Sequence, residues 1–277
     1  MYHVSFNGWD ANLPVNPVAF SLGGFEVRWY GVVICLGLLL AVLYAWFNSK
    51  KYDVDNNKLI DCALVGIVSG IIGARLYYVV FNFSLYADNP IEILYINEGG
   101  LAIYGGIIGG LLGGIAIAKL HKMNIPALLD IAVMGFLIGQ ALGRWGNFFN
   151  QEAFGSPTNL PWGMISENTN GIAVHPCFLY ESLWCALGFV LFHFLRKKLQ
   201  YYRGEVFLWY LVWYGFERTF VEGLRTDSLY LFGSGIRVSQ LLSALLAVVG
   251  AALIVYFRKR KDEFYEVGNH PVSTLIS

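Results

Sequence analysis

Long apolar stretches alternate with short polar ones along most of the chain. A helix needs about 20 predominantly apolar residues to cross the ~30 Å hydrocarbon core of a bilayer, and seven stretches approach or reach that length. We therefore predict seven transmembrane helices, over residues 30–48, 59–81, 101–118, 126–146, 177–195, 206–221 and 238–257.

The composition agrees with a membrane protein. Of 277 residues, 56% are hydrophobic and only 14% are charged, and the mean hydropathy is +0.53. A soluble domain cannot bury that much apolar surface, so the fold class predicted is an all-α integral membrane protein. Residues 1–25 lack the pattern of a cleavable signal peptide and are expected to lie at the membrane interface.

The basic residues predict the orientation. Clusters of lysine and arginine follow the first, third, fifth and seventh predicted spans. Cytoplasmic loops carry such an excess, so the N-terminus is predicted outside and the C-terminus inside. Residues 1–257 then form one body and residues 258–277 a cytoplasmic tail. A small extracytoplasmic head is expected from the loops at about 82–100, 148–175 and 222–237.

Arginines alone make up the basic residues toward the outer side. An ionised arginine within a span costs about 2.5–3.5 kcal/mol on insertion scales, so a group of them needs a partner. The planar guanidinium binds two oxygens of a phosphate or carboxylate at once, which favours a shared anionic ligand. The alternative is that each arginine reaches the interface or pairs with Glu181, Glu217, Glu222 or Asp227. The six outer arginines are Arg28, Arg75, Arg144, Arg218, Arg225 and Arg237.

One predicted span carries a polar face. In "WYGFERTFVEGLR", Tyr214, Arg218 and Glu222 follow at intervals of four, and Arg225 comes three residues later. Residues at this spacing share a helix face. Such a face avoids lipid and is expected to line a ligand site, although an Arg-Glu network that holds neighbouring helices gives the same pattern.

A second polar group ends the fourth predicted span. In "GRWGNFFNQEAFG", Arg144 and Asn147 share a helix face, and Asn150, Glu152 and Gly155 continue into the next loop. A helix end capped by amides is the alternative, but one asparagine suffices for a cap. We interpret the stretch as part of an anion or headgroup site.

Further candidates lie at the same depth. Glycines spaced four apart in the second and third spans predict close helix packing, which would hold Arg75 and Tyr104 near the outer end. His175 precedes Pro176 in "HPCFLYES", where a helix cap or turn is the alternative to a binding role. A lone outer histidine does not favour a metal site, and no Walker loop, G-x-S-x-G or H-E-x-x-H motif is present.

These motifs resemble one family. "RWYG", "GARLYYVVF", "GRWGNFFNQEAFG", "HPCFLYES" and "YGFERTFVEGLR" are similar to those of the bacterial prolipoprotein diacylglyceryl transferases, over about residues 17–257. The resemblance implies a multi-pass enzyme of the bacterial plasma or inner membrane, with its active site facing the outer leaflet. It implies transfer of the diacylglyceryl group of phosphatidylglycerol to the lipobox cysteine of prolipoprotein signal peptides, which forms a thioether and releases glycerol 1-phosphate. It implies no metal, no cofactor and no nucleic acid.

The resemblance also implies site residues. Arg144, Arg218 and Tyr104 are the expected catalytic residues, and Tyr104 stands where many members have a histidine. A free phenol with a pKa near ~10 is a weak base at neutral pH, although nearby arginines lower such a value. The expected substrate-binding residues are Tyr30, Arg75, Asn147, Asn150, Glu152, Gly155, His175, Tyr214, Glu222 and Arg225.

Two other classes of protein share parts of this pattern. A transporter or channel for organic phosphate anions also lines its path with arginines, but here they gather toward one leaflet and no convincing inverted repeat is present. A seven-helix receptor or retinal protein shares the topology. The last span contains no lysine for a Schiff base, and the loops offer no sensor domain.

Overall fold

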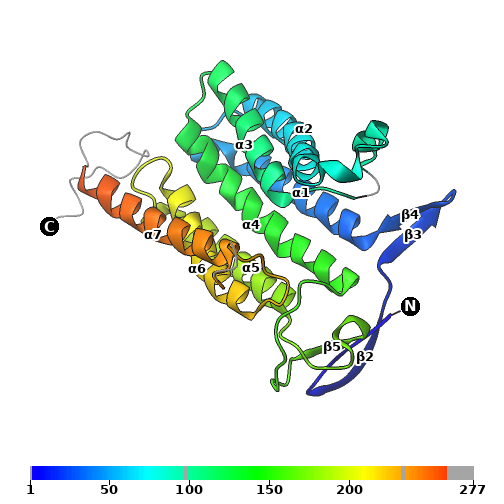
Figure 1. Ribbon diagram of the computed structural model, residues 1–277. Coiled ribbons are helices and arrows are strands. Elements are labelled where there is room, and N and C mark those ends of the chain that lie inside the picture. The colour runs from blue at the N-terminus through cyan, green and yellow to red at the C-terminus, as the bar shows by residue number, and fades with distance from the viewer. Residues whose placement is uncertain (1, 97–98, 232–234, 261–277) are drawn as a thin grey trace. The chain divides into compact units, whose positions relative to one another are not determined.

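Seven long helices form most of the protein in the computed structural model, which describes residues 2–96, 99–231 and 235–260 (Figure 1). Residues 261–277, most of the predicted tail, and residues 97–98 and 232–234 in two predicted head loops lie outside the described residues. The helices are α1 (Trp29–Asn48), α2 (Asn56–Phe81), α3 (Ile103–Leu120), α4 (Ile125–Asn150), α5 (Cys177–Leu199), α6 (Glu205–Leu224) and α7 (Val238–Lys259).

Each helix coincides with a predicted span. Within the described residues, six are long and apolar enough to cross a membrane, and the exception is α6. Four charged residues lower the apolar character of α6, but its glutamates Glu205, Glu217 and Glu222 are all buried inside the protein. The seven predicted helices are therefore confirmed. By length and composition, six of them, within the described residues, qualify as membrane spans.

The chain divides into two compact units, residues 1–44 with 132–277 and residues 45–131. In the second unit, α2 and α3 pack through glycines. A Cβ added at Gly70 would lie 3.2 Å from the carbonyl oxygen of Gly106, and one added at Gly73 would overlap that of Gly105. The predicted small-residue packing is confirmed, since a side chain at these positions would separate the helices.

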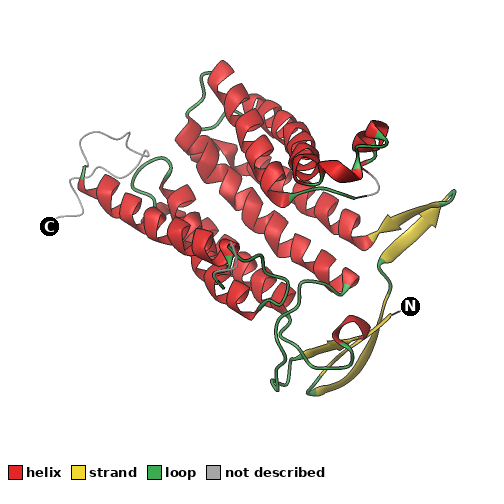
Figure 2. Ribbon diagram, viewed as in Figure 1, coloured by secondary structure: helices red, strands yellow, loops and turns green. Residues whose placement is uncertain are grey.

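The first unit contains strands that the sequence analysis did not predict. A three-stranded antiparallel sheet has the order β2 (Trp9–Val15), β1 (Tyr2–Phe6), β5 (Met164–Ser166), with Val4 opposite both Leu13 and Ser166 (Figure 2). A hairpin of β3 (Val18–Leu22) and β4 (Phe25–Arg28) leads directly into α1. The expected interfacial segment is thus folded as four strands, and the fold is not purely helical.

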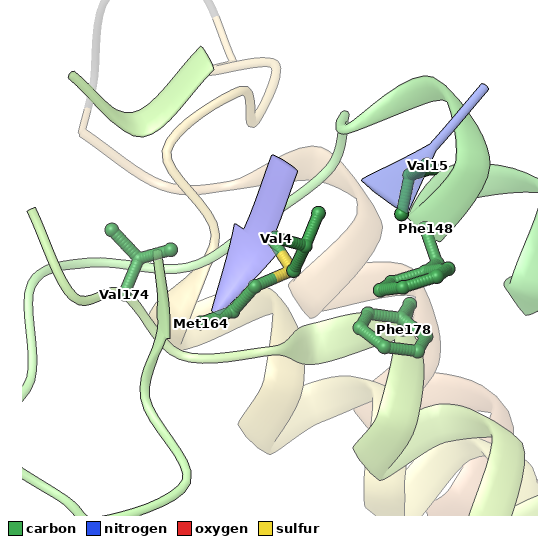
Figure 3. Close-up of a cluster of buried hydrophobic side chains, with 6 residues drawn as sticks. All are labelled: Val4, Val15, Phe148, Met164, Val174 and Phe178. Carbon is green, nitrogen blue, oxygen red and sulfur yellow. The ribbon is translucent and has the colours of Figure 1, made fainter. Parts of the chain in front are cut away.

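A hydrophobic cluster attaches the sheet to the ends of two helices (Figure 3). Val4 of β1 and Met164 of β5 pack with Phe148 near the end of α4 and Phe178 at the start of α5. The backbone N–H of His3 also donates to Glu167, 2.8 Å away, which holds the pKa of this carboxyl below its usual value. The sheet therefore fixes the two helix ends that carry "GRWGNFFNQEAFG" and "HPCFLYES".

Candidate active site

Glu181 of α5 is the centre of a buried ionic cluster. Its side chain is only 1% exposed and forms an ion pair with Arg144 of α4. Arg218 of α6 approaches the other carboxylate oxygen at 2.9 Å, and Arg225 lies 3.9 Å from it. Three of the six outer arginines, from two separate motifs, thus converge on one acid.

A second layer of acids holds two of these arginines. Arg218 also pairs with Glu222 at 2.5 Å, one turn along α6 as the spacing predicted. Arg225 binds both carboxylate oxygens of Asp227, at 2.9 and 2.6 Å. These hydrogen bonds hold the pKa of Asp227 below its usual value. Arg225 follows the last residue of α6, so the prediction that it continues the helical face is wrong in that detail.

Of the three arginines that meet Glu181, Arg144 has the most free hydrogen-bonding capacity. A guanidinium has five N–H donors, and within the described residues Glu181 is the only ion-pair or hydrogen-bond partner of Arg144. Its side chain is 20% exposed, compared with 13% for Arg218 and Arg225. The cluster therefore presents unused donors to its surroundings mainly through Arg144.

Two tyrosines lie near Arg144. Tyr214 stacks on Tyr210 with 5.7 Å between ring centroids, and it interacts electrostatically with Arg144 and Glu181. Tyr30 of α1 packs its ring against Gly146, where a Cβ would overlap it, and lies within electrostatic range of Arg144. Two of the three predicted tyrosines, Tyr30 and Tyr214, thus lie near the cluster.

The polar stretch at the end of α4 is ordered around Glu152. The side-chain amides of Asn147 and Asn150 donate to the same carboxylate oxygen of Glu152, at 3.0 and 3.3 Å. Glu152 is exposed, and Asn147 lies three residues after Arg144 on the helix. This arrangement extends the cluster with two half-buried amide groups and an exposed carboxylate.

Gly155 lies in the loop after α4, where the chain comes close to His175 and to Cys177 at the start of α5. Its N–H donates to the carbonyl of His175 at 2.9 Å, and a Cβ here would lie 2.7 Å from that of His175 and 3.0 Å from the sulfur of Cys177. The imidazole of His175 lies 3.2 Å from the hydroxyl of Tyr180. The backbone of His175 therefore joins the loop after α4 to the start of α5, and Gly155 permits the close approach.

Arg75 and Tyr104 belong to the second unit. The Arg75 guanidinium donates to the carbonyls of Glu92, Ile93, Tyr95, Gly99 and Gly100, at 2.6 to 3.5 Å. Its donors are thus engaged by the loop after α2, beside a cavity of about 190 Å³, and Arg75 organises that loop. Tyr104 is the second residue of α3, and its ring centroid lies 6.5 Å from that of Tyr77.

The central role of Glu181 was not predicted. From the sequence, Glu181 was expected only as one possible partner of the arginines, together with Glu217, Glu222 and Asp227. One signal was present, because Glu181 is an acid one turn inside an otherwise apolar predicted span. Such a residue faces the protein interior and has a charged partner.

Comparison with known proteins shows the family of this chain. A family model described as prolipoprotein diacylglyceryl transferase matches residues 17–256. The chain belongs to the prolipoprotein diacylglyceryl transferase family. The match includes every residue of the ionic cluster and all seven helices except the last residues of α7.

Curated relatives of the diacylglyceryl transferase family are similar over almost the whole chain. A protein of Enterococcus faecalis is 46% identical over 263 residues, covering 91% of this chain and 94% of its own length. One of Staphylococcus aureus is 44% identical over 254 residues, covering 88% and 90%. One of Clostridium novyi is 42% identical over 251 residues, covering 87% and 95%. All three are named phosphatidylglycerol--prolipoprotein diacylglyceryl transferase.

Proposed function

We propose that this chain transfers the diacylglyceryl group of phosphatidylglycerol to the cysteine thiol of prolipoproteins. The observation that carries the proposal is the similarity of nearly the whole chain to relatives named for this activity. In the reaction, the thiolate attacks the carbon of the diacylglyceryl group that is bonded to the phosphate oxygen. The bond between this carbon and the oxygen breaks, and glycerol 1-phosphate leaves. The product is a thioether.

The arginine cluster is suited to the leaving group. Negative charge grows on the phosphate as the carbon-oxygen bond breaks, and donors fixed in a water-poor site stabilise that charge without having to reorganise. In this proposal Arg144 binds the phosphate with its free donors, and Arg218 assists from α6. Glu181 holds both guanidinium groups in register, as a buried acid that pairs with cations does.

The surrounding groups then bind the rest of the substrate. Tyr30 and Asn147 flank Arg144 and are assigned to the glycerol headgroup. Tyr214, Glu222 and Arg225 support Arg218 and the cluster. The thiol must also lose a proton, because the thiolate is the nucleophile. Tyr104, at the position of the family's histidine, and an acid of the cluster are the two candidate acceptors.

The proposal includes a location. We assign the chain to the bacterial plasma membrane, with α6 as a seventh span whose charges are shielded by burial. The N-terminus, the two small sheets and the ionic cluster then lie toward the outer leaflet, and the basic loops lie in the cytoplasm. Phosphatidylglycerol enters from the outer leaflet, and the prolipoprotein approaches from the loops.

A reconstituted reaction tests the function. Purified protein, phosphatidylglycerol vesicles and a lipobox peptide should give a peptide whose mass is increased by one diacylglyceryl group. A peptide with serine in place of the lipobox cysteine is the matched control and should remain unmodified. The protein is shown to be folded by a cooperative thermal unfolding transition. If such protein gives no product with the cysteine peptide, the activity is refuted.

A further inference from the structure

One buried carboxyl group has no part in the cluster's ion pairs. Glu217 of α6 is only 6% exposed, and neither of its carboxylate oxygens has a hydrogen-bond partner among the residues that the structure describes. By contrast, Glu181, Glu222 and Asp227 each bind at least one arginine. An unsatisfied buried polar group of this kind calls for a specific explanation.

Glu217 faces the reacting side of the helix bundle. Gly215, two residues earlier, contacts Ser243 and Ala247 of α7. Two residues correspond to about 200° on a helix, so Glu217 is directed away from α7. Its carboxyl interacts electrostatically with Arg144 of α4, Glu181 of α5 and Arg218 of α6. It therefore lies on the side of α6 that meets α4 and α5.

A layer of polar side chains lies next to the cluster, one turn farther along α4 and α5 toward the predicted cytoplasmic side. Gln140, one turn before Arg144, donates to the hydroxyl of Tyr210 at 2.9 Å. The Cys185 thiol, one turn after Glu181, lies 3.7 Å from the side-chain oxygen of Gln140. Cys185 also interacts electrostatically with Glu217. Glu217 is thus placed between the phosphate-binding arginines and an internal hydrogen-bonded layer.

A carboxylate in this setting is stabilised when it takes up a proton or accepts a hydrogen bond. Burial of a carboxylate without a bonded partner is costly, and a general base needs a lone pair that no other group occupies. Glu181, Glu222 and Asp227 each have at least one carboxylate oxygen in an ion pair with a guanidinium group. Among these four acids, Glu217 is the one for which the described residues provide neither a hydrogen bond nor an ion pair to either oxygen.

We propose that Glu217 is the catalytic base that accepts the proton of the lipobox thiol. This proposal rests on the transferase activity proposed above. The sulfur-hydrogen bond breaks, the proton passes to the Glu217 carboxylate, and the thiolate forms the carbon-sulfur bond as the carbon-oxygen bond to phosphate breaks. The phosphate leaves with that electron pair and receives the proton from Glu217, which restores the carboxylate.

A change of nucleophile tests this role. A lipobox peptide with selenocysteine in place of cysteine is ionised at neutral pH and needs no base. With the cysteine peptide, Glu217→Gln should slow transfer by about 100-fold or more, the usual contribution of a general base. With the selenocysteine peptide, the same variant should react within a few-fold of the unmodified protein. Glu217→Asp should recover part of the rate with the cysteine peptide.

Glu205→Gln is the matched control, because Glu205 is a fully buried acid at the other end of the same helix, bound to Arg258 at 2.6 Å. This variant should lower thermal stability and affect both peptides equally. The proposal is overturned if Glu217→Gln keeps the full rate with the cysteine peptide, or if it slows both peptides by the same factor. Failure of the unmodified protein with both peptides would instead refute the transferase activity.

Discussion

At the scale of single residues, the choice of arginine over lysine is the main chemical feature of the site. Arg218 contacts Glu181 and Glu222 through different nitrogens, and Arg225 contacts Asp227 through two. A lysine ammonium is a single point of charge and cannot make these forked contacts. Arg144 keeps donors free for a further oxyanion.

Replacement of Arg144 by lysine tests this feature. Arg144→Lys keeps the charge but loses the fork, so the rate of diacylglyceryl transfer should fall by roughly 100-fold, in the range for removal of one transition-state donor. The mass gain of a lipobox peptide measures the rate. Arg196→Lys, at the end of α5 outside the cluster, is the control and should stay within about twofold. Full activity of Arg144→Lys would contradict the phosphate contact.

The pair of Arg225 and Asp227 predicts a dependence of stability on pH. The pKa of Asp227 is lowered by hydrogen bonds from Arg225, so its contribution is present above the unfolded value near ~3.9 and is lost as the pH falls through the folded value. Because the Asp227 side chain is 50% exposed, the effect should be about 1 kcal/mol or less.

Thermal unfolding in detergent measures this contribution. Asp227→Asn should lower Tm slightly at pH 6, and the difference from the unmodified protein should vanish toward pH 2. Asp88→Asn, at an exposed position in a loop, should match the unmodified protein at both values. A difference for Asp227→Asn that persists unchanged at low pH would show that the carboxylate charge is not its source.

Sequence spacing alone was sufficient to predict contacts between residues on the same helix. The interval of four between Arg218 and Glu222 predicted their ion pair, which is present. Glu181 was different, because its importance arises from contacts with α4 and α6 that are distant in sequence. Arg75 shows the same limit, since its partners are backbone carbonyls and carry no side-chain signature.

At the scale of elements, helix packing was predictable and sheet formation was not. Glycines repeated every fourth residue identify a face on which α2 and α3 approach closely. The strands of the first 28 residues gave no comparable signal. In particular, β1 pairs with β5 more than 150 residues away, and such non-local pairing cannot be inferred from local periodicity.

Two adjacent glycines of α3 test the packing. A Cβ at Gly105 would overlap the carbonyl oxygen of Gly73 and the side chain of Tyr77, whereas one at Gly106 would lie 3.6 Å from its nearest neighbour, Ala74. Gly105→Ala should therefore destabilise the protein by about 1–3 kcal/mol, the usual cost of overpacking. Gly106→Ala should be neutral or slightly stabilising. Equal Tm values for the two variants in detergent would contradict the close approach.

At the scale of the whole molecule, the proposed activity requires one orientation in the membrane. Basic residues predict that the loops after α1, α3 and α5 are cytoplasmic, which puts β5 and its neighbouring loops outside. A substrate drawn from the outer leaflet and a secreted peptide can both reach the cluster only in this orientation.

Labelling of introduced cysteines tests the orientation. Asn159 and Lys198 are exposed and lie on opposite predicted sides. A membrane-impermeant maleimide should modify Asn159→Cys in intact cells, and it should modify Lys198→Cys only after the cells are permeabilised. The protein without these substitutions is the control for its four native cysteines, three of which are buried. The reverse pattern would place the cluster toward the cytoplasm.

In the proposed reaction, the guanidinium group of Arg144 binds the phosphate of phosphatidylglycerol. Solid-state NMR of protein with ¹⁵N-labelled arginine in phosphatidylglycerol bilayers measures the dipolar coupling between guanidinium nitrogen and lipid phosphorus. If Arg144 binds the phosphate, the spectrum should contain a coupling that corresponds to hydrogen-bonding distance and that is lost from the spectrum of Arg144→Lys. A spectrum with no such coupling, or one that Arg144→Lys leaves unchanged, would contradict it.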